Sequence, residues 1–413
     1  MHIPGLSKSI LETFPVSFFR ARLAAICCIC KKGTQRDQNF YAGYSCNQPG
    51  GACVRGTDVT LTSSMKIIKK ILKWTGLLLL ACLLVFTVFV LLPVEKKVAP
   101  IQPRENTEYW EMNGGFRIAY TQHHNTADTL KTPVVFLHGG PGGYIHSSII
   151  RALKPLSHSG HDVYLYDQRG SGLSDRLPRI TDVNFDHHLA DLQEIVTEHI
   201  GTDKVILIGQ SFGASIAAHY AAYYPDKVEK VILTSPGDLV PQFDSLGQYI
   251  DIMSRYPTPD TLEFKEVYSF VSDVNSTAIH PKAIVAGAGA LLFDRKFIAD
   301  SEMDALLNNL ASRFTRGMVC DSSHVLPEEG GGGLYAYIGT NNDDMADVRH
   351  LLPQVKAPLL VMHGQCDFIP FAAAYEYVDL MPNGTYTFIP DAGHEIWWDR
   401  EEVFTQTIID FLQ

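Results

Sequence analysis

A serine set between two glycines is the residue whose surroundings most strongly indicate chemistry. The run Gly209-Gln210-Ser211-Phe212-Gly213 follows an apolar stretch, 205–208, and opens a helix-compatible stretch that reaches residue 224. Between a strand and a helix, the pattern G-x-S-x-G is typical of a nucleophilic serine at a sharp turn. The glycines permit the strained backbone of such a turn and let the strand and helix pass closely. A plain glycine-rich turn is the alternative, and the context favours Ser211 as a nucleophile.

An aspartate and a histidine nearer the C-terminus could activate this serine. A serine hydroxyl is a weak nucleophile and needs a base, together with a group that orients the base. Asp367 and His394 each follow an expected strand, in the chain order serine, acid, histidine. Because the carboxyl ends of parallel strands share one edge of a sheet, Ser211 would lie at the same edge. Asp391 is a rival acid, but it is too near His394 in sequence to reach around the imidazole ring easily.

A glycine-rich loop could supply the amides that acyl transfer requires. The run His138-Gly139-Gly140-Pro141-Gly142-Gly143 follows the first expected parallel strand. Backbone N–H groups in a loop without bulky side chains can approach a developing oxyanion. We assign one donor to the amide of Gly140 and the second to the amide of Phe212, and we expect His138 to be structural. A triad and an oxyanion hole suffice for acyl transfer, so no metal or organic cofactor is expected.

Alternating strands and helices must position these residues. From residue 108 onward, short apolar runs alternate with helix-compatible stretches such as 186–199 and 212–224, after a β-hairpin that turns at Asn113-Gly114. This order predicts an α/β fold with a mostly parallel sheet covered by helices on both faces. The expected strands after the hairpin are 134–137, 163–166, 205–208, 231–233, 359–362 and 386–389.

One long interval breaks this rhythm. Residues 237–353 contain helix-like segments and the glycine run 330–333 but no apolar strand run. A structureless loop of this length is uncommon inside a compact domain, so an inserted helical lid is the better interpretation. The remaining divisions are an extension (1–64), a basic flank with a membrane helix (65–98) and a core in two parts (105–236 and 354–413).

An uncharged segment near residue 80 has the length of a membrane span. Between Lys73 and Glu95 lie 21 residues without a charge. At about 1.5 Å per residue this run covers roughly 30 Å, the thickness of a bilayer's hydrocarbon layer. Lysines cluster more tightly before the segment than after it, which favours a cytoplasmic N-terminus, a single-pass anchor and an exported catalytic domain. The alternatives are a buried core helix, a cleaved signal peptide and a lipoprotein box at Cys82.

Charge and cysteine content limit other roles. The net charge of −11 gives no support for nucleic-acid binding, so a small molecule or a short peptide is the expected partner. Residues 1–64 hold five of the eight cysteines without paired C-x-x-C motifs, which disfavours a zinc site. Met65 has the surroundings of a natural start, so this extension is expected to be dispensable. The later part of the chain carries only Cys320 and Cys366 and is not expected to be a disulfide scaffold.

Three runs together resemble one family. The runs His138 to Gly143, Asp167-Gln168-Arg169-Gly170-Ser171-Gly172-Leu173-Ser174 and Gly209 to Gly213 are similar to those of the proline iminopeptidase branch of the α/β-hydrolase superfamily. The similarity extends over roughly 107–413. It implies an α/β-hydrolase fold and an aminopeptidase that releases an N-terminal residue, often proline, through an acyl-enzyme. The resemblance also implies that Ser211, Asp367 and His394 form the catalytic triad.

The sequence departs from this family at two places. Phe212 stands where those peptidases commonly have a tryptophan, and a membrane anchor is unusual for the branch. In that family, carboxylates of the lid hold the amine of the substrate. The candidates for this role here are Glu263, Glu266, Glu302 and Asp304.

Two other functions remain open. The same triad could serve a membrane-anchored carboxylesterase or lipase-like hydrolase. The chain could also be a catalytically silent, hydrolase-like binding protein, although all three catalytic residue types occur in the required order.

Overall fold

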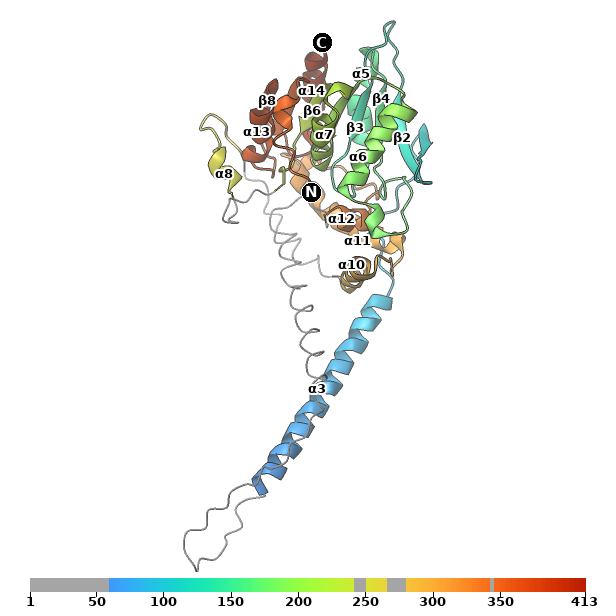
Figure 1. Ribbon diagram of the computed structural model, residues 1–413, viewed down its shortest axis with the longest axis vertical. Coiled ribbons are helices and arrows are strands. Elements are labelled where there is room, and N and C mark those ends of the chain that lie inside the picture. Colours follow the sequence, from blue (N-terminus) through green and yellow to red (C-terminus); the bar gives the residue numbers. More distant parts are fainter. Residues whose placement is uncertain (1–58, 241–249, 266–279, 342–344) are drawn as a thin grey trace, which may run out of the picture. The chain divides into compact units, whose positions relative to one another are not determined.

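The computed structural model describes residues 59–240, 250–265, 280–341 and 345–413, with side chains from residue 65 onward. The described chain forms two compact units, a long helix that ends at Leu91 and a body that begins at Leu92 (Figure 1). Each unit is described by itself. Glu266 and the five cysteines of the N-terminal extension lie outside the described residues.

Helix α3 (Val59–Leu91) is long and apolar enough to cross a membrane. The candidate span is Met65–Leu91, and none of its most apolar window is buried inside the protein. The helix ends three residues before the end of the predicted uncharged run, because Pro93 disfavours helical backbone in the residue before it. The Thr87 hydroxyl donates to the Leu83 carbonyl at 2.8 Å, so this polar side chain is satisfied within the helix. Insertion of α3 into a bilayer stays a prediction.

An eight-stranded sheet in the order β1-β2-β4-β3-β5-β6-β7-β8 forms the centre of the body (Figure 1). The predicted opening hairpin is present, with β1 antiparallel to β2 and β2 antiparallel to β4. All other neighbours are parallel, which confirms the predicted mostly parallel sheet. The strands are β1 (Thr107–Glu111), β2 (Arg117–His123), β3 (Val134–Leu137), β4 (Val163–Tyr166), β5 (Val205–Gln210), β6 (Val228–Thr234), β7 (Leu359–Gly364) and β8 (Gly384–Ile389).

Helices cover both faces of this sheet, as predicted. Alternate strand residues point to opposite faces, so Leu207 belongs to one buried apolar cluster and Ile208 to the other. The cluster on the Leu207 face includes residues of α6 (Phe185–Glu194), α7 (Phe212–Tyr223) and α13 (Phe371–Leu380). The cluster on the Ile208 face includes residues of α4 (Ser147–Leu153), α5 (Pro155–His158) and α14 (Ile396–Leu412). A wider helical turn, Ile195–His199, continues α6.

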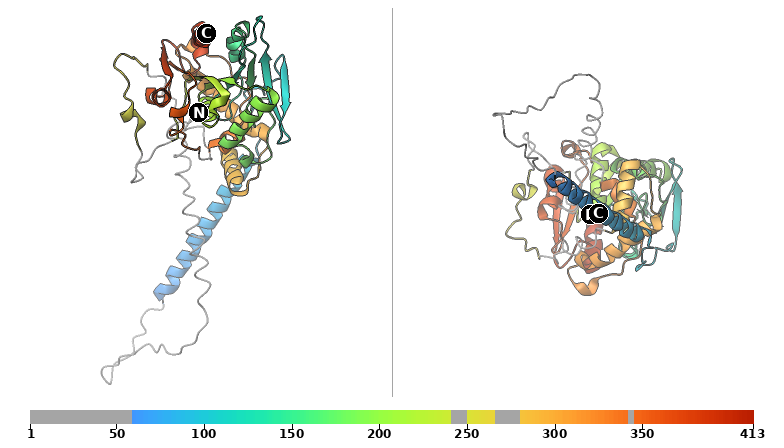
Figure 2. Two further views of the ribbon diagram at one scale, coloured as in Figure 1. Left: turned by 45° about the horizontal axis from the view of Figure 1, so that its top comes forward. Right: turned by 90° about the horizontal axis from the view of Figure 1, so that it is seen from below.

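The described part of the insertion between β6 and β7 is helical and contains no strand. It comprises α8 (Ile252–Arg255), α10 (Pro281–Phe293), α11 (Asp300–Phe314) and α12 (Leu334–Asn341). The last three helices share a small apolar core that includes Ala286, Met303 and Tyr335, and they lie beyond one end of the strands (Figure 1, Figure 2). Short 3-10 turns occupy Ile180–Asp182, Pro225–Lys227, Thr315–Met318, Ser322–His324 and Leu352–Gln354.

Candidate active site

Ser211 lies between β5 and α7 in a strained backbone conformation, with φ of +52° and ψ of −115°. A non-glycine residue at such angles costs of order 1–3 kcal/mol and is found mainly where function requires it. The flanking glycines have a direct steric cause. A Cβ atom on Gly209 would lie 2.5 Å from the Gly213 carbonyl oxygen, and one on Gly213 would lie 2.1 Å from the Leu137 carbonyl oxygen. The turn therefore requires the predicted G-x-S-x-G pattern.

The structure brings Asp367 and His394 together. His394 Nδ1 donates to Asp367 Oδ1 at 2.8 Å, and the same oxygen accepts the N–H of Ile369 at 2.9 Å. Burial alone would raise the pKa of Asp367, but the charge and hydrogen bond of His394 hold it below its ordinary value. The rival acid, Asp391, is exposed and pairs with Lys265 at 2.9 Å. The geometry thus gives His394 the acid that the sequence favours.

Residues at the end of β6 connect the serine turn to the histidine loop. The Ser211 N–H donates to the Thr234 carbonyl at 3.0 Å, and the hydroxyl of the next residue, Ser235, donates to the His394 carbonyl at 2.8 Å. The hydrogen bonds of the described residues do not include one between the side chains of Ser211 and His394. Such contacts are often long before substrate binds. The structure therefore pairs His394 with Asp367, and the end of β6 links the Ser211 turn to the His394 loop.

The loop predicted to stabilise an oxyanion lies against Ser211. A Cβ atom on Gly139 would be 3.0 Å from the Ser211 Cβ, and Gly140 has a positive φ of +142° that favours glycine. Phe212 is the first residue of α7, so its amide has no partner within the helix. The roles of the Gly140 and Phe212 amides as oxyanion donors stay predictions.

His138 is held as a neutral structural residue. Its Nε2 accepts the N–H of Gln168 at 2.9 Å, and its Nδ1 contacts the Gly139 carbonyl at 2.7 Å. Burial lowers the pKa of His138 to about 4. A histidine with both ring nitrogens engaged is not available as a second base, which agrees with the expectation from sequence.

Comparison with known proteins supports the fold. A family model described as "alpha/beta hydrolase fold" matches residues 132–263. An esterase from Exiguobacterium antarcticum has a similar structure, with 19% identity, a TM-score of 0.51, and coverage of 74% of this chain and 98% of the esterase. The chain has the α/β-hydrolase fold.

The sequence relatives of this α/β-hydrolase fold are hydrolases of different kinds. A 2-hydroxy-6-oxononadienedioate/2-hydroxy-6-oxononatrienedioate hydrolase from Paraburkholderia phymatum is 25% identical over 300 residues, which cover 70% of this chain and 90% of that protein. A proline iminopeptidase from Saccharolobus solfataricus is 40% identical over 161 residues, which cover 32% of this chain and 51% of that protein. The names and the fold support an enzyme of hydrolase type. They support the α/β-hydrolase superfamily as a whole. Support for the proline iminopeptidase branch is narrower, because that match covers about half of the relative.

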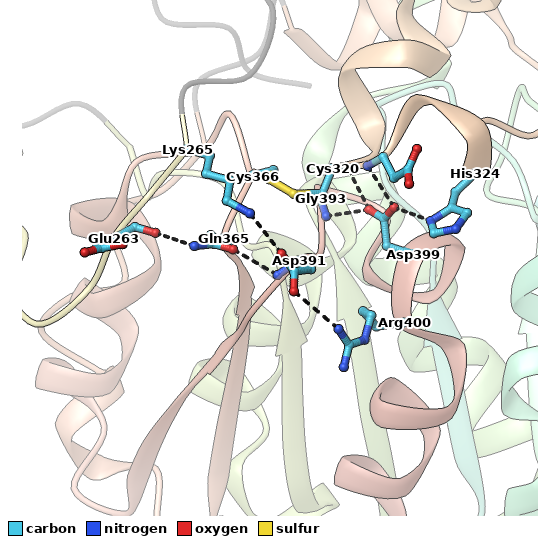
Figure 3. The surroundings of a disulfide bond; sticks show 11 residues. Glu263, Lys265, Cys320, His324, Gln365, Cys366, Asp391, Gly393, Asp399 and Arg400 are labelled. Atoms are coloured by element: carbon cyan, nitrogen blue, oxygen red, sulfur yellow. Dashed lines mark hydrogen bonds and ion pairs between the residues drawn. A yellow bond between two sulfur atoms is a disulfide. The ribbon is translucent and has the colours of Figure 1, made fainter.

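A disulfide joins the insertion to the loop of the candidate acid, Asp367, in this hydrolase fold. Cys320 pairs with Cys366, which directly precedes Asp367 (Figure 3). The sequence did not predict this pair, because the two cysteines are 46 residues apart and nothing in their spacing marks them as neighbours. The disulfide ties a segment after α11 to the carboxyl end of β7.

Asp399 joins the same segment to the loop of the candidate base, His394. Its buried carboxylate accepts the N–H of Gly393 at 2.8 Å and the N–H of Cys320 at 2.7 Å (Figure 3). It also accepts the N–H of Asp321 at 3.2 Å and a hydrogen bond from His324 Nδ1 at 2.8 Å. Because Gly393 directly precedes the histidine, Asp399 helps to fix the position of the candidate base.

The predicted lid carboxylates are engaged elsewhere or point away. Glu302 forms an ion pair with the buried Lys282, and Asp304 binds Arg176 at 3.0 Å. Glu263 is exposed, and its backbone carbonyl accepts a hydrogen bond from the Gln365 side chain at 2.8 Å. Glu302 and Asp304 would therefore have to give up an ion pair to hold a substrate amine.

Two other carboxylates lie beside the candidate site, Glu395 directly after His394 and Glu328 against Tyr144, and sequence reasoning missed them. Burial, with the charges of Asp367 and Glu328, raises the pKa of Glu395 to about 8, and its Oε2 atom is buried without a hydrogen-bond partner. Burial also raises the pKa of Glu328, whose carboxylate is hydrogen-bonded to Tyr144 beside the glycine-rich loop. The available signal was the position of Glu395 directly after His394. Within the described residues, no group of three or more potential ligands is arranged to hold a metal ion.

Proposed function

We propose that the chain is a serine hydrolase that cleaves an acyl bond through an acyl-enzyme at Ser211. The observation that carries this proposal is the buried hydrogen bond of 2.8 Å between Asp367 and His394, at the sheet edge where Ser211 occupies its strained turn. A histidine whose Nδ1 is held by a carboxylate presents Nε2 as the proton acceptor that a serine nucleophile needs.

The proposed reaction has two halves. Ser211 Oγ attacks the acyl carbon while His394 Nε2 takes its proton, and the amides of Gly140 and Phe212 stabilise the negative oxygen that forms. His394 then donates the proton to the leaving group as the acyl bond breaks. In the second half, His394 takes a proton from a water molecule that attacks the acyl-enzyme, and it returns that proton to Ser211 Oγ as the acyl–oxygen bond breaks and the acid is released. Asp367 remains ionised throughout and stabilises the imidazolium.

We propose further that the substrate carries an amine near its scissile acyl carbon, as an aminopeptidase substrate does. Glu395 follows the candidate base directly, and Glu328 lies close enough for its charge to raise the pKa of Glu395. Bringing a cation between two crowded carboxylates relieves their repulsion and favours their ionised forms. The same carboxylates disfavour a dicarboxylate substrate, such as the name of the dienedioate hydrolase implies for that relative.

A substrate series tests this assignment. Proline-, alanine- and leucine-naphthylamides would be compared with their N-acetylated forms and with short acyl esters. Glu395→Gln should raise KM for the free amines by about 10-fold or more, while the exposed Glu263→Gln serves as the control and should match the wild type. Faster turnover of acetylated amides or neutral esters than of free amines would contradict the aminopeptidase assignment and favour the esterase. No turnover of any substrate in the series, together with no covalent labelling by a fluorophosphonate, would favour the catalytically silent binding protein.

We also propose that α3 anchors the chain in a membrane with the hydrolase fold on the exported side. The length and composition of Met65–Leu91 support a span, and the lysines before it support this orientation. The disulfide between Cys320 and Cys366 supports an oxidising compartment. A chain that lacks residues 1–98 should leave the membrane fraction. Its retention there would show that α3 is either not the anchor or not the whole of it.

A further inference from the structure

The C-terminal end of α10 exposes large apolar side chains on the insertion. Leu292 and Phe293 are each 69% exposed, Leu291 is 42% exposed and Phe297 is 52% exposed. These four residues are called the apolar lid tip. The rings of Phe293 and Phe297 lie 6.0 Å apart, and the Phe297 ring packs over Gly289, so the tip is one connected surface.

The core of the insertion does not account for this exposure. The same helix buries Ala286 and Ala290 against α11 and α12, so its core-facing side is already occupied. Arg295 is exposed beside the tip, with its guanidinium 5.6 Å from the centre of the Phe297 ring. Segments that lie in a membrane interface typically contain leucine and phenylalanine beside an arginine whose side chain can extend to lipid headgroups.

The segment that leaves α3 is attached to the same insertion. The side chain of Asn309, on α11, donates to the Glu95 carbonyl at 2.6 Å and accepts the Lys97 N–H at 3.0 Å. Ile101 then donates its N–H to the Gly330 carbonyl at 3.2 Å. Residues 92–95 can extend over at most about 14 Å. The insertion therefore holds the chain within a few residues of the end of α3.

The tip is rigidly connected to that attachment point. Asn309 and Asp300, the first residue of α11, are separated by about 14 Å along the helix axis. A short connection, 294–299, joins Asp300 to the end of α10, and both helices share the core that contains Met303. The attachment of the chain and the apolar lid tip therefore belong to one packed helical pair.

We propose that the apolar lid tip docks on the outer surface of the bilayer in which α3 is anchored. This inference rests on the proposed anchor and goes beyond the proposed reaction. Docking would bury Leu292, Phe293 and Phe297 among the headgroups and upper acyl chains, with Arg295 at the phosphate level. It would fix the insertion, and with it the approach to Ser211, beside the membrane.

Photo-crosslinking in the full chain tests this docking. The protein would be reconstituted in phosphatidylcholine vesicles with benzoylphenylalanine in place of Leu292, and adducts would be identified by mass spectrometry after flotation. Leu130 provides the matched control, because it is 73% exposed and lies between β2 and β3 at the opposite, amino end of the parallel strands. We expect lipid adducts at position 292 at least about 10-fold above those at position 130.

A second variant tests whether apolar contact is the cause. With benzoylphenylalanine in place of Phe297, Leu292→Asp should lower the lipid adduct by about 5-fold or more, without affecting folding because the side chain is exposed. Adducts to a second copy of the chain, or equal lipid adducts at positions 292 and 130, would overturn the proposal while the protein still floats with the vesicles. Failure of the full chain to float would overturn the anchor and the docking together.

Discussion

Replacement of Asp399 with alanine should weaken both the stability of the fold and the reactivity of Ser211. The variant removes the acceptor of the Gly393 and Cys320 amides, at 2.8 and 2.7 Å, and of two further donors nearer the surface. Hydrogen bonds to a charged group each contribute about 1.5–3 kcal/mol. Since water can reach part of the vacated site, we expect a loss near the lower limit for the two short bonds, about 3 kcal/mol. That corresponds to a fall in Tm of about 6–12 °C.

The assay combines thermal unfolding with the rate of covalent labelling by a fluorophosphonate. Labelling should slow by about 10-fold or more, because a small displacement of Gly393 misplaces His394, and misplacement by 1 Å can cost roughly 10²-fold. Asp391→Asn is the matched control. Asp391 is exposed, its ion pair with Lys265 is screened by solvent and contributes little to stability, and asparagine tolerates its positive φ of +52°. An Asp399→Ala protein as stable and as reactive as this control would refute the reasoning.

Three further substitutions probe the acid, the disulfide and the orientation of the chain. Asp367→Ala should slow labelling by on the order of 10²–10⁴-fold, and a rate within a few-fold of wild type would reject the acid. The same change should make the free energy of unfolding depend less on pH in the acid range. The folded-state pKa of Asp367 lies below its ordinary 3.8, so its stabilisation is present above pH 4 or so and is lost as pH falls through the folded-state value. Cys320→Ser should lower the free energy of unfolding by about 2–4 kcal/mol, and an unchanged Tm would show that the Cys320–Cys366 bond contributes nothing. Asn383, exposed in the acceptor pattern Asn383-Gly384-Thr385, should carry a glycan when the full chain enters a eukaryotic secretory pathway. A wild-type band that does not shift on deglycosylation would contradict the exported orientation of this site.

The sheet was predictable because each strand is locally marked. Strands buried on both faces must be continuously apolar, so 134–137 and 163–166 stand out from the helices around them and match β3 and β4 residue for residue. The serine turn is equally local, since the backbone carbonyls that exclude a side chain at Gly209 and Gly213 come from the turn and its neighbouring strand. The end of α3 is also marked in the sequence, by Pro93, whereas the uncharged run that predicted the span continues up to Glu95.

The surroundings of the triad were less predictable because they depend on contacts between distant segments. Its greater sequence separation from His394 favoured Asp367 over Asp391, and packing placed Asp367 against His394. By contrast, the partners that engage Glu302 and Asp304 lie on other helices and loops, so these carboxylates looked free in the sequence. The burial that raises the pKa of Glu395 is likewise a tertiary property.

The most direct test of the central claim is the position of the covalent adduct that a fluorophosphonate forms with the intact protein. The account predicts a single modified peptide that contains Ser211, no adduct in Ser211→Ala, and an adduct formed at least about 10²-fold more slowly in His394→Ala. A modified residue other than Ser211, or undiminished labelling of Ser211→Ala, would contradict it.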